Sequence, residues 1–295
     1  MTQRFGALEA GGTKFVCAVG SGPDDLSEEV RFPTTDPATT MARTIEFFTS
    51  AGPLDAVGIA SFGPVELRRT SESFGFITTT PKPGWSNTDV AGPVAAALGV
   101  PVGFDTDVNG AALGEGRWGA AQGLDTFVYV TVGTGLGGGA LVGGRIAHGL
   151  VHAEMGHVSV RRMPHDDFPG ICPFHGDCFE GMAAGPAIAA RWGRPATELA
   201  DDELAEAVRI ESFYIAAGLR NIVYTIAPQR IIVGGGVAKM PGLLGQLRRA
   251  LRDTLARYPG LPEHDDDDFV VPPGLGDHAG IAGALVLAEL ALHGG

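Results

Sequence analysis

Residues 5–20 read FGALEAGGTKFVCAVG, and residues 126–146 read TFVYVTVGTGLGGGALVGGRI. In each stretch two apolar runs flank a glycine-rich turn, a pattern that predicts an antiparallel strand hairpin. Because the same pattern opens twice in one chain, we expect an internal duplication with two α/β halves. We divide these halves at residues 1–118 and 119–295 and expect two lobes with a cleft between them.

The remaining pattern supplies similar elements to both halves. In the first half, 56–61 predicts a buried strand, and Asp36 before a proline predicts the start of a helix. A short strand at 102–104 precedes Asp105-Thr106-Asp107-Val108-Asn109 and a helix of small residues. In the second half the pattern predicts helices at 185–193, 202–226 and 241–257 and strands at 230–233 and 269–271. A last apolar helix at 279–292 is expected to pack back on the first lobe.

Three glycine clusters follow predicted strands: Gly11-Gly12-Thr13-Lys14, Gly133-Thr134-Gly135 and Gly234-Gly235-Gly236. Glycine lets backbone N–H groups approach an anion closely, while threonine and lysine add donors for phosphate oxygens. The second cluster matches the dinucleotide pattern GxGxxG, but that motif needs a following helix and a return strand is predicted here. No GxxxxGK[ST] sequence exists, which excludes a P-loop. The clusters are therefore candidate phosphate cradles, with tight hairpin turns as the alternative reason for each glycine.

Composition narrows the possible partners. The chain has 295 residues, 44% of them hydrophobic, and a formal net charge of −13 at pH 7. Nucleic-acid binders usually carry a basic patch. The nearest candidate here, Arg248, Arg249 and Arg252, is expected on one solvated helix face. No stretch reaches the roughly 18 apolar residues of a membrane helix, and the N-terminus lacks a signal-peptide pattern. We expect a cytoplasmic protein with neither nucleic-acid nor membrane partners.

Four motifs are spread along the chain: Glu9-Ala-Gly-Gly-Thr-Lys, Asp107-Val-Asn, Glu154-Met-Gly-His157 and the segment Cys172-Pro-Phe-His-Gly-Asp-Cys178. With them the whole chain resembles the bacterial sugar kinases of the ROK family, and in particular their fructokinase branch. The resemblance implies an actin-like ATPase fold (ribonuclease H-like) of the actin/hexokinase superfamily, with two lobes and an interlobe cleft. The family often has Asp in place of Glu9, Asn in place of Thr106, and a cysteine in place of His175.

The resemblance implies that Asp107 is the catalytic base. Phosphoryl transfer to an alcohol needs a group that accepts the hydroxyl proton. Asp107 follows a predicted strand and precedes a predicted helix, where a side chain can point into a cleft. The alternative for a lone aspartate at this place is a helix N-cap, and Asp105 is a neighbouring rival for the catalytic role.

The resemblance also implies residues for the sugar and the nucleotide. Carboxylates form charge-assisted hydrogen bonds with polyols, so Glu154 and Glu180 are candidate acceptors for sugar hydroxyls. The other candidates for the sugar pocket are Gly63, Thr80, Thr106, Asn109 and His157. The nucleotide phosphates are expected on Gly11, Gly12, Thr13, Lys14, Thr131, Gly133, Thr134 and Gly135. The adenosine is expected near Gly234, Gly235 and Gly236.

Four metal-ligating residues follow the spacing His-x14-Cys-x2-His-x2-Cys: His157, Cys172, His175 and Cys178. Zinc favours tetrahedral sulfur and nitrogen ligands, and four protein ligands close the site, which makes its role structural. Disulfides are rare in a reducing compartment. We predict a structural zinc ion that braces the loop bearing Glu154 and Glu180. His152 and His165 are rival ligands, and a coincidental His/Cys-rich loop is the alternative.

The predicted activity is transfer of phosphate from ATP, with Mg²⁺, to the 6-hydroxyl of D-fructose, giving fructose 6-phosphate and ADP. The resemblance also implies a homodimer. Two alternatives remain: a kinase for another hexose, such as mannose or glucose, and a non-enzymatic sugar-responsive regulator that keeps the fold. Asp107 argues against the regulator. So does the first hairpin, which begins at Phe5 and leaves no room for the N-terminal DNA-binding segment of the family's repressors.

Overall fold

The computed structural model describes residues 3–294, which form two five-stranded sheets of the same topology. The strand orders are β3-β2-β1-β4-β7 and β10-β9-β8-β11-β12. In each sheet an antiparallel hairpin is followed by a parallel strand beside the first strand of that hairpin. The matching orders confirm the internal duplication. The first sheet contains β1 (Phe5–Ala10), β2 (Lys14–Gly20), β3 (Ser27–Pro33), β4 (Ala56–Ser61) and β7 (Val102–Thr106).

The second sheet contains β8 (Phe127–Val132), β9 (Leu136–Val142), β10 (Arg145–Ile146), β11 (Arg230–Gly234) and β12 (Val270–Val271). A small third sheet pairs β5 (Phe76–Ile77) with β6 (Thr88–Asp89). Within residues 3–294, no helix combines the length and the apolar character that crossing a bilayer would require.

The chain divides into two compact units, each built on one large sheet. Unit 1 comprises the described residues up to Gly123, Ile146–Ala153 and the described residues from Gly274 onward. Unit 2 comprises Leu124–Arg145 and Glu154–Pro273. Our sequence-based division at residue 118 did not anticipate that the short segment Ile146–Ala153 belongs with unit 1.

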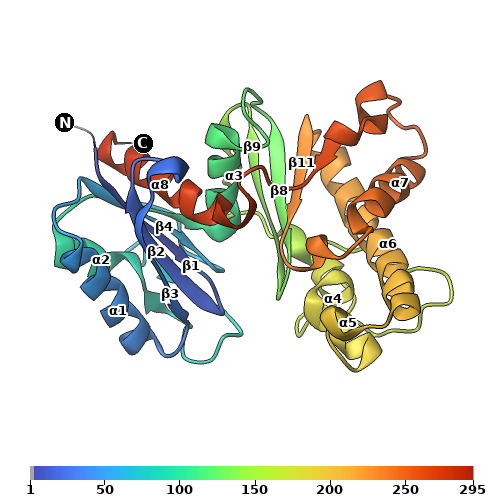
Figure 1. Ribbon diagram of the computed structural model, residues 1–295, viewed down its shortest axis with the longest axis horizontal. Helices are drawn as coiled ribbons and strands as arrows, with labels where there is room; N and C mark the ends of the chain where they lie inside the picture. Colours follow the sequence, from blue (N-terminus) through green and yellow to red (C-terminus); the bar gives the residue numbers. More distant parts are fainter. Residues whose placement is uncertain (1–2, 295) are drawn as a thin grey trace. The chain divides into compact units, whose positions relative to one another are not determined.

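Four helices cover the two faces of the unit 1 sheet: α1 (Pro37–Ser50), α2 (Ala91–Leu98), α3 (Asp107–Trp118) and α8 (Ala279–Leu292). Successive strand side chains point to opposite faces, so Leu8 and Ala10 pack with α1 and α2 while Phe5 and Ala7 pack with α8. Figure 1 shows α8, from the end of the sequence, lying along the first strands of the chain. Asp36 caps α1 as predicted, because its carboxylate accepts a hydrogen bond from Thr39 N at 2.9 Å.

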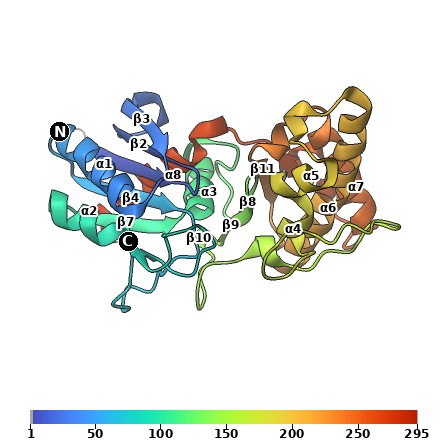
Figure 2. The ribbon, with the colours of Figure 1, turned by 90° about the horizontal axis from the view of Figure 1, so that it is seen from below.

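Unit 2 carries the other four helices of the described chain: α4 (Phe179–Ala183), α5 (Gly185–Trp192), α6 (Asp201–Ile226) and α7 (Leu243–Leu255). The predicted helices at 185–193, 202–226 and 241–257 match the last three of these within two residues, whereas the short α4 was not predicted. Figure 2 shows the four helices gathered beside β8, β9 and β11. The long α6 packs on both α4 and α7 and thereby joins them into one layer.

Glycines allow α3, α8 and β4 to approach one another at backbone distance. A Cβ on Gly58 of β4 would lie 1.7 Å from Ala284 O, and one on Gly283 would lie 1.7 Å from Gly110 O. Glycine inside a helix costs about 1 kcal/mol relative to alanine, so its presence at these contacts reflects packing. The close packing sets where α3 lies on the sheet, and with it the position of Asp107 at its start.

Candidate functional site

The turn from Gly11 to Lys14 joins β1 to β2 and is closed by its own backbone. Gly11 N donates to Lys14 O at 3.0 Å, and Thr34 Oγ1 donates to Gly11 O at 2.6 Å. A Cβ on Gly11 would lie 2.8 Å from Lys14 O, so the turn requires glycine there. Thr13 and Lys14 are exposed, which leaves a hydroxyl and an ammonium group at the turn as donors for an anion.

The two glycine clusters of unit 2 lie side by side. They follow the parallel strands β8 and β11, which pair Thr131 with Gly234. A Cβ on Gly133 would lie 3.7 Å from Gly236 N, while one on Gly235, where φ is +91°, would lie 2.3 Å from Val132 O. The structure thus brings the predicted phosphate residues 131–135 and the predicted adenosine residues 234–236 together at one edge of the sheet.

Thr106 caps helix α3, and Asp107 is the first residue of that helix. Thr106 Oγ1 accepts a hydrogen bond from Asn109 N at 3.1 Å. The alternative reading of Asp107 as the N-cap is therefore wrong by one residue, because the residue before it fills that role. Asp107 is only partly buried, whereas Thr106 and Asn109 are 4% exposed. Asp107 is thus the one residue of these three that presents its side chain toward solvent.

Glu9 at the end of β1 is an electrostatic neighbour of Asp107. Burial, and after it the negative charge of Asp107, raise the pKa of Glu9 to about 7 against the lowering effect of Lys14. Its carboxyl lies against α8, where a Cβ on Gly280 would be 2.6 Å from the carboxyl carbon. Two carboxyl groups next to the first glycine turn would bind a cation favourably, because a positive charge stabilises both ionised forms.

The sequence indicated Asp105 only as a rival for the catalytic role and did not predict its contact with His148. Asp105 is 2% exposed, and its Oδ1 accepts from Asn109 Nδ2 and from Thr106 N, each at 2.7 Å. Its Oδ2 lies 2.9 Å from Nε2 of His148 in the segment Ile146–Ala153. The only sequence signal was a pair of histidines four residues apart after β10, which does not identify their partners.

Two predicted sugar residues of unit 1 lie in loops. Gly63 precedes Pro64, and a Cβ on it would lie 3.6 Å from the His152 ring. His152 Nε2 accepts a hydrogen bond from Val65 N at 3.0 Å, which removes His152 from the predicted metal ligands. Thr80 Oγ1 accepts from Lys82 N at 3.3 Å.

The four predicted metal ligands come together in unit 2. Their ligand atoms all lie within 4.8 Å of one another. His157 Nδ1 is 3.7 Å from Cys172 Sγ and 3.6 Å from Cys178 Sγ, and His175 Nδ1 is 3.7 Å from Cys172 Sγ. Tetrahedral zinc with bonds of about 2.0–2.3 Å would separate its ligands by about 3.3–3.8 Å. The donor set and its spacing therefore fit zinc, and His165 is not part of this cluster.

The two predicted sugar carboxylates flank the Cys/His cluster along the chain. Glu154 is exposed, with its Oε2 4.0 Å from His157 Nε2. Glu180 lies in α4, for which Cys178 is the N-cap residue, and its Oε2 accepts a hydrogen bond from Leu136 N at 3.0 Å. One Glu180 oxygen thus holds the backbone just after the glycine turn 133–135, a contact that the sequence did not indicate.

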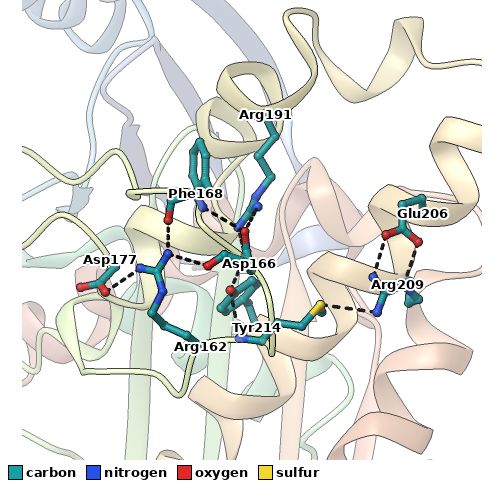
Figure 3. A network of polar contacts seen from close by, with 9 residues as sticks. Arg162, Asp166, Phe168, Asp177, Arg191, Glu206, Arg209 and Tyr214 are labelled. Carbon is teal, nitrogen blue, oxygen red and sulfur yellow. Dashed lines mark hydrogen bonds and ion pairs between the residues drawn. The ribbon is translucent and has the colours of Figure 1, made fainter.

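A polar network anchors the irregular chain that leads to the cluster. Arg191 of α5 donates to both oxygens of Asp166, at 2.8 and 2.7 Å, and Tyr214 of α6 donates to the same carboxylate (Figure 3). Arg162 donates to Asp166 O at 2.9 Å and to Asp177 Oδ2 at 2.8 Å. Because Asp177 directly precedes Cys178, the network extends from α5 and α6 to the edge of the cluster.

Comparison with known proteins identifies the relatives of this chain. A family model described as ROK family matches residues 5–291. A fructokinase of Zymomonas mobilis is 47% identical over 290 residues, covering 96% of each chain. A fructokinase of Pediococcus pentosaceus is 41% identical over 288 residues, covering 98% of each chain. The resemblance inferred from the motifs is therefore confirmed.

Solved structures agree with these relatives. A ROK hexokinase from Thermus thermophilus has a TM-score of 0.80 and 29% identity, covering 99% of this chain and all of its own. A ROK family glucokinase from Streptomyces griseus, solved in complex with glucose and AMPPNP, has a TM-score of 0.76 and 25% identity, covering 97% of this chain and 99% of its own. The predicted α/β, actin-like fold is confirmed.

We expect Asp166→Asn to weaken unit 2 in a pH-dependent way. Hydrogen bonds from Arg191 hold the pKa of Asp166 well below its ordinary value, although partial burial opposes them. A depressed folded pKa means that the pair stabilises the fold above about pH 4 and that this stabilisation is lost as the pH falls further. The variant should lower the free energy of unfolding by about 3 kcal/mol at pH 7, with the difference from wild type shrinking below about pH 4.

Denaturant unfolding at pH 7 and pH 3 measures both values. Glu206→Gln is the matched control, because it breaks an ion pair with Arg209 whose side chains are 45% and 52% exposed. It should cost less than about 1 kcal/mol. An Asp166→Asn cost as small as that of the control would contradict the anchoring role.

Proposed function

Because the chain belongs to the ROK family, we propose that it is an ATP-dependent kinase that phosphorylates D-fructose at its 6-hydroxyl. The observation that carries the proposal is the 41–47% identity to two fructokinases over nearly the full chain. The ROK hexokinase and glucokinase of known structure are less similar, at 29% and 25% identity. These values favour fructose over glucose as the acceptor.

Asp107 is the proposed general base. The partly buried carboxylate at the start of α3 would accept the proton of the fructose 6-hydroxyl as the hydroxyl oxygen attacks the γ-phosphorus and the bond from that phosphorus to the bridging oxygen of ADP breaks. Proton acceptance by a positioned side chain contributes about 10²–10⁴-fold to a rate. When bound, Mg²⁺ neutralises phosphate charge. Glu9 and Asp107 offer carboxylate oxygens of the kind that this ion prefers. The two groups are electrostatic neighbours, because the charge of Asp107 raises the pKa of Glu9.

The glycine turns are the proposed phosphate and nucleotide sites. The N–H groups of Gly11 and Gly133 are bonded within their own turns, and the other backbone N–H groups lie at strand ends, where an anion can be approached without a side chain in the way. The turn 11–14 adds the exposed Thr13 and Lys14, and the turn 133–135 adds the exposed Thr134. The turn 234–236 is proposed for the adenosine because it lies beside the turn 133–135.

Seven residues are proposed to contact fructose. Unit 1 would supply Gly63, Thr80, Thr106 and Asn109, of which Thr106 and Asn109 also hold the start of α3. Unit 2 would supply Glu154, His157 and Glu180. The contact between Glu180 and Leu136 N suggests that this carboxylate also orders the second glycine turn.

The Cys/His cluster is proposed to hold one structural zinc ion. Four ligands from the protein close the coordination sphere, so that no position remains for substrate. The ion would tie His157, close to Glu154, to the segment that starts α4 and carries Glu180. Its role is to hold these carboxylates in place while taking no part in phosphoryl transfer. We also propose a cytoplasmic location, where reduced thiols are the rule, and a homodimer, as the family resemblance implies.

A panel of hexoses tests the acceptor. With ATP and Mg²⁺, kcat/KM measured by ADP release should be highest for fructose, since specificity is a ratio of such values. Mannose is expected to be a poor second substrate. Higher kcat/KM with glucose would assign the chain to another hexose, and ADP release with no sugar in the panel would favour the regulator.

Asp107→Asn tests the base. Asparagine keeps the size of the side chain but cannot accept the hydroxyl proton, so kcat with fructose should fall by at least about 10²-fold. Fructose binding measured by calorimetry should persist. Asp24→Asn, at an exposed aspartate of the same unit, serves as the control and should be unchanged. Near-normal turnover in a folded Asp107→Asn protein would remove Asp107 from the mechanism.

Elemental analysis tests the metal. We expect about one zinc per chain, as a single four-ligand site implies. Cys178→Ser should lose zinc and melt at a lower temperature, because metal binding free energy stabilises the fold around the site. Cys17→Ala is the matched control: Cys17 is buried in the unit 1 core, and its loss should leave the zinc content unchanged. A metal-free protein with unchanged melting would identify the cluster as a simple His/Cys-rich loop.

A further inference from the structure

The segment Ile146–Ala153 is attached to unit 1 mainly by polar contacts. Leu150 and Val151 at its tip are 82% and 53% exposed, so they bury little apolar area. The two histidines on either side face each other across a single β-bridge. One of them, His148, contacts Asp105, and the other, His152, accepts the Val65 N–H. The position of this segment therefore depends on its two imidazole rings.

His148 contacts the turn between β7 and α3 at the buried carboxylate of Asp105, whose second oxygen needs a hydrogen-bond donor. Asp105 Oδ1 already accepts from Thr106 N and Asn109 Nδ2, whereas Oδ2 pairs with His148 Nε2 at 2.9 Å. A buried carboxylate that loses one donor carries the desolvation cost of that oxygen, about 1–3 kcal/mol or more. The Asp105 side chain is 3% exposed, so water cannot easily replace the imidazole, which is itself 39% exposed.

The residues that His148 contacts through Asp105 lie on either side of Asp107 in the sequence. Asp105 orients the Asn109 amide at 2.7 Å, and the Asn109 backbone N–H is the one that Thr106 caps. Asp107 lies between these residues, at the first position of α3. The His148–Asp105–Asn109 contacts thus enclose the backbone turn that determines where the Asp107 carboxylate points.

We propose that His148 is a positioning residue for phosphoryl transfer: by donating to Asp105, it holds the β7–α3 turn so that Asp107 faces the acceptor hydroxyl. The inference rests on the proposed function of Asp107. His148 itself touches neither sugar nor nucleotide in this scheme. Both its neutral Nε2–H form and its imidazolium form can donate, and the hydrogen bond to Asp105 raises the pKa of His148. Donation to Asp105 therefore persists across neutral pH.

Kinetics of five variants in the full chain test this role. His148→Ala removes the donor, and His148→Gln replaces it with an amide N–H. His293→Gln is the control at an exposed histidine of the same unit. Asp105→Asn, alone and combined with His148→Ala, completes a double-mutant cycle. For each protein, kcat and the KM values for fructose and ATP are measured, and thermal melting establishes the folded fraction.

Misplacing a reacting group by about 1 Å can cost about 10²-fold in rate. We therefore expect His148→Ala to lower kcat about 10- to 100-fold with an unchanged KM for ATP. His148→Gln should recover most of the loss, and His293→Gln should match wild type. In the Asp105→Asn background, adding His148→Ala should have almost no further effect, because both changes interrupt the same contact.

Three results would overturn the inference. The first is an unchanged kcat in folded His148→Ala. The second is a higher KM for fructose with an unchanged kcat, which would make His148 a direct sugar contact. The third is full additivity in the cycle, which would mean that His148 does not act through Asp105. A wild-type chain that phosphorylates no sugar would instead refute the proposed function, so the two failures are distinguishable.

Discussion

The backbone-to-backbone packing of α3, α8 and β4 is the constraint on which unit 1 depends. At Gly58 and Gly283 there is no room for even a methyl group beside the neighbouring backbone, and a Cβ on Gly110 would lie 2.7 Å from the Ala60 Cβ. Interiors packed this closely do not deform continuously, so α3 has one position on the sheet. Because α8 comes from the end of the chain, the position of α3 depends on a contact between segments far apart in the sequence.

This constraint makes a short segment chemically decisive. Thr106 caps α3, Asp107 begins it, and Asn109 links its first turn to Asp105. Close packing at Gly110 holds the body of α3, and hydrogen bonds from Asn109 to Thr106 and Asp105 hold its first turn. A carboxylate at the start of a helix held this way has little backbone freedom, which is a general property of preorganised groups.

Local patterns in the sequence were enough to predict the strand hairpins, the glycine turns and the Asp107 motif. Apolar alternation and glycine turns involve residues only a few positions apart in the sequence, and the Cys/His motif is nearly as local. Contacts between distant segments could not be predicted in this way. The exposed Leu150 and Val151 give no periodic signal for the place of 146–153, and nothing near Glu180 indicates that its carboxylate binds Leu136 N. Even the N-cap of α3 was ambiguous, because Thr106 and Asp107 are both good capping residues.

The chain from residue 146 to Cys178 contains little regular structure, and polar anchors replace hydrophobic burial along it. His148 and His152 hold its first part, and the Cys/His cluster together with the Asp166 network holds its second part. Glu154 lies two residues after one anchor and three before the next. The anchors on the side of the Cys/His cluster therefore restrict the backbone at this exposed carboxylate. Its backbone conformation is therefore limited by its neighbours along the chain, and not by burial of its own side chain.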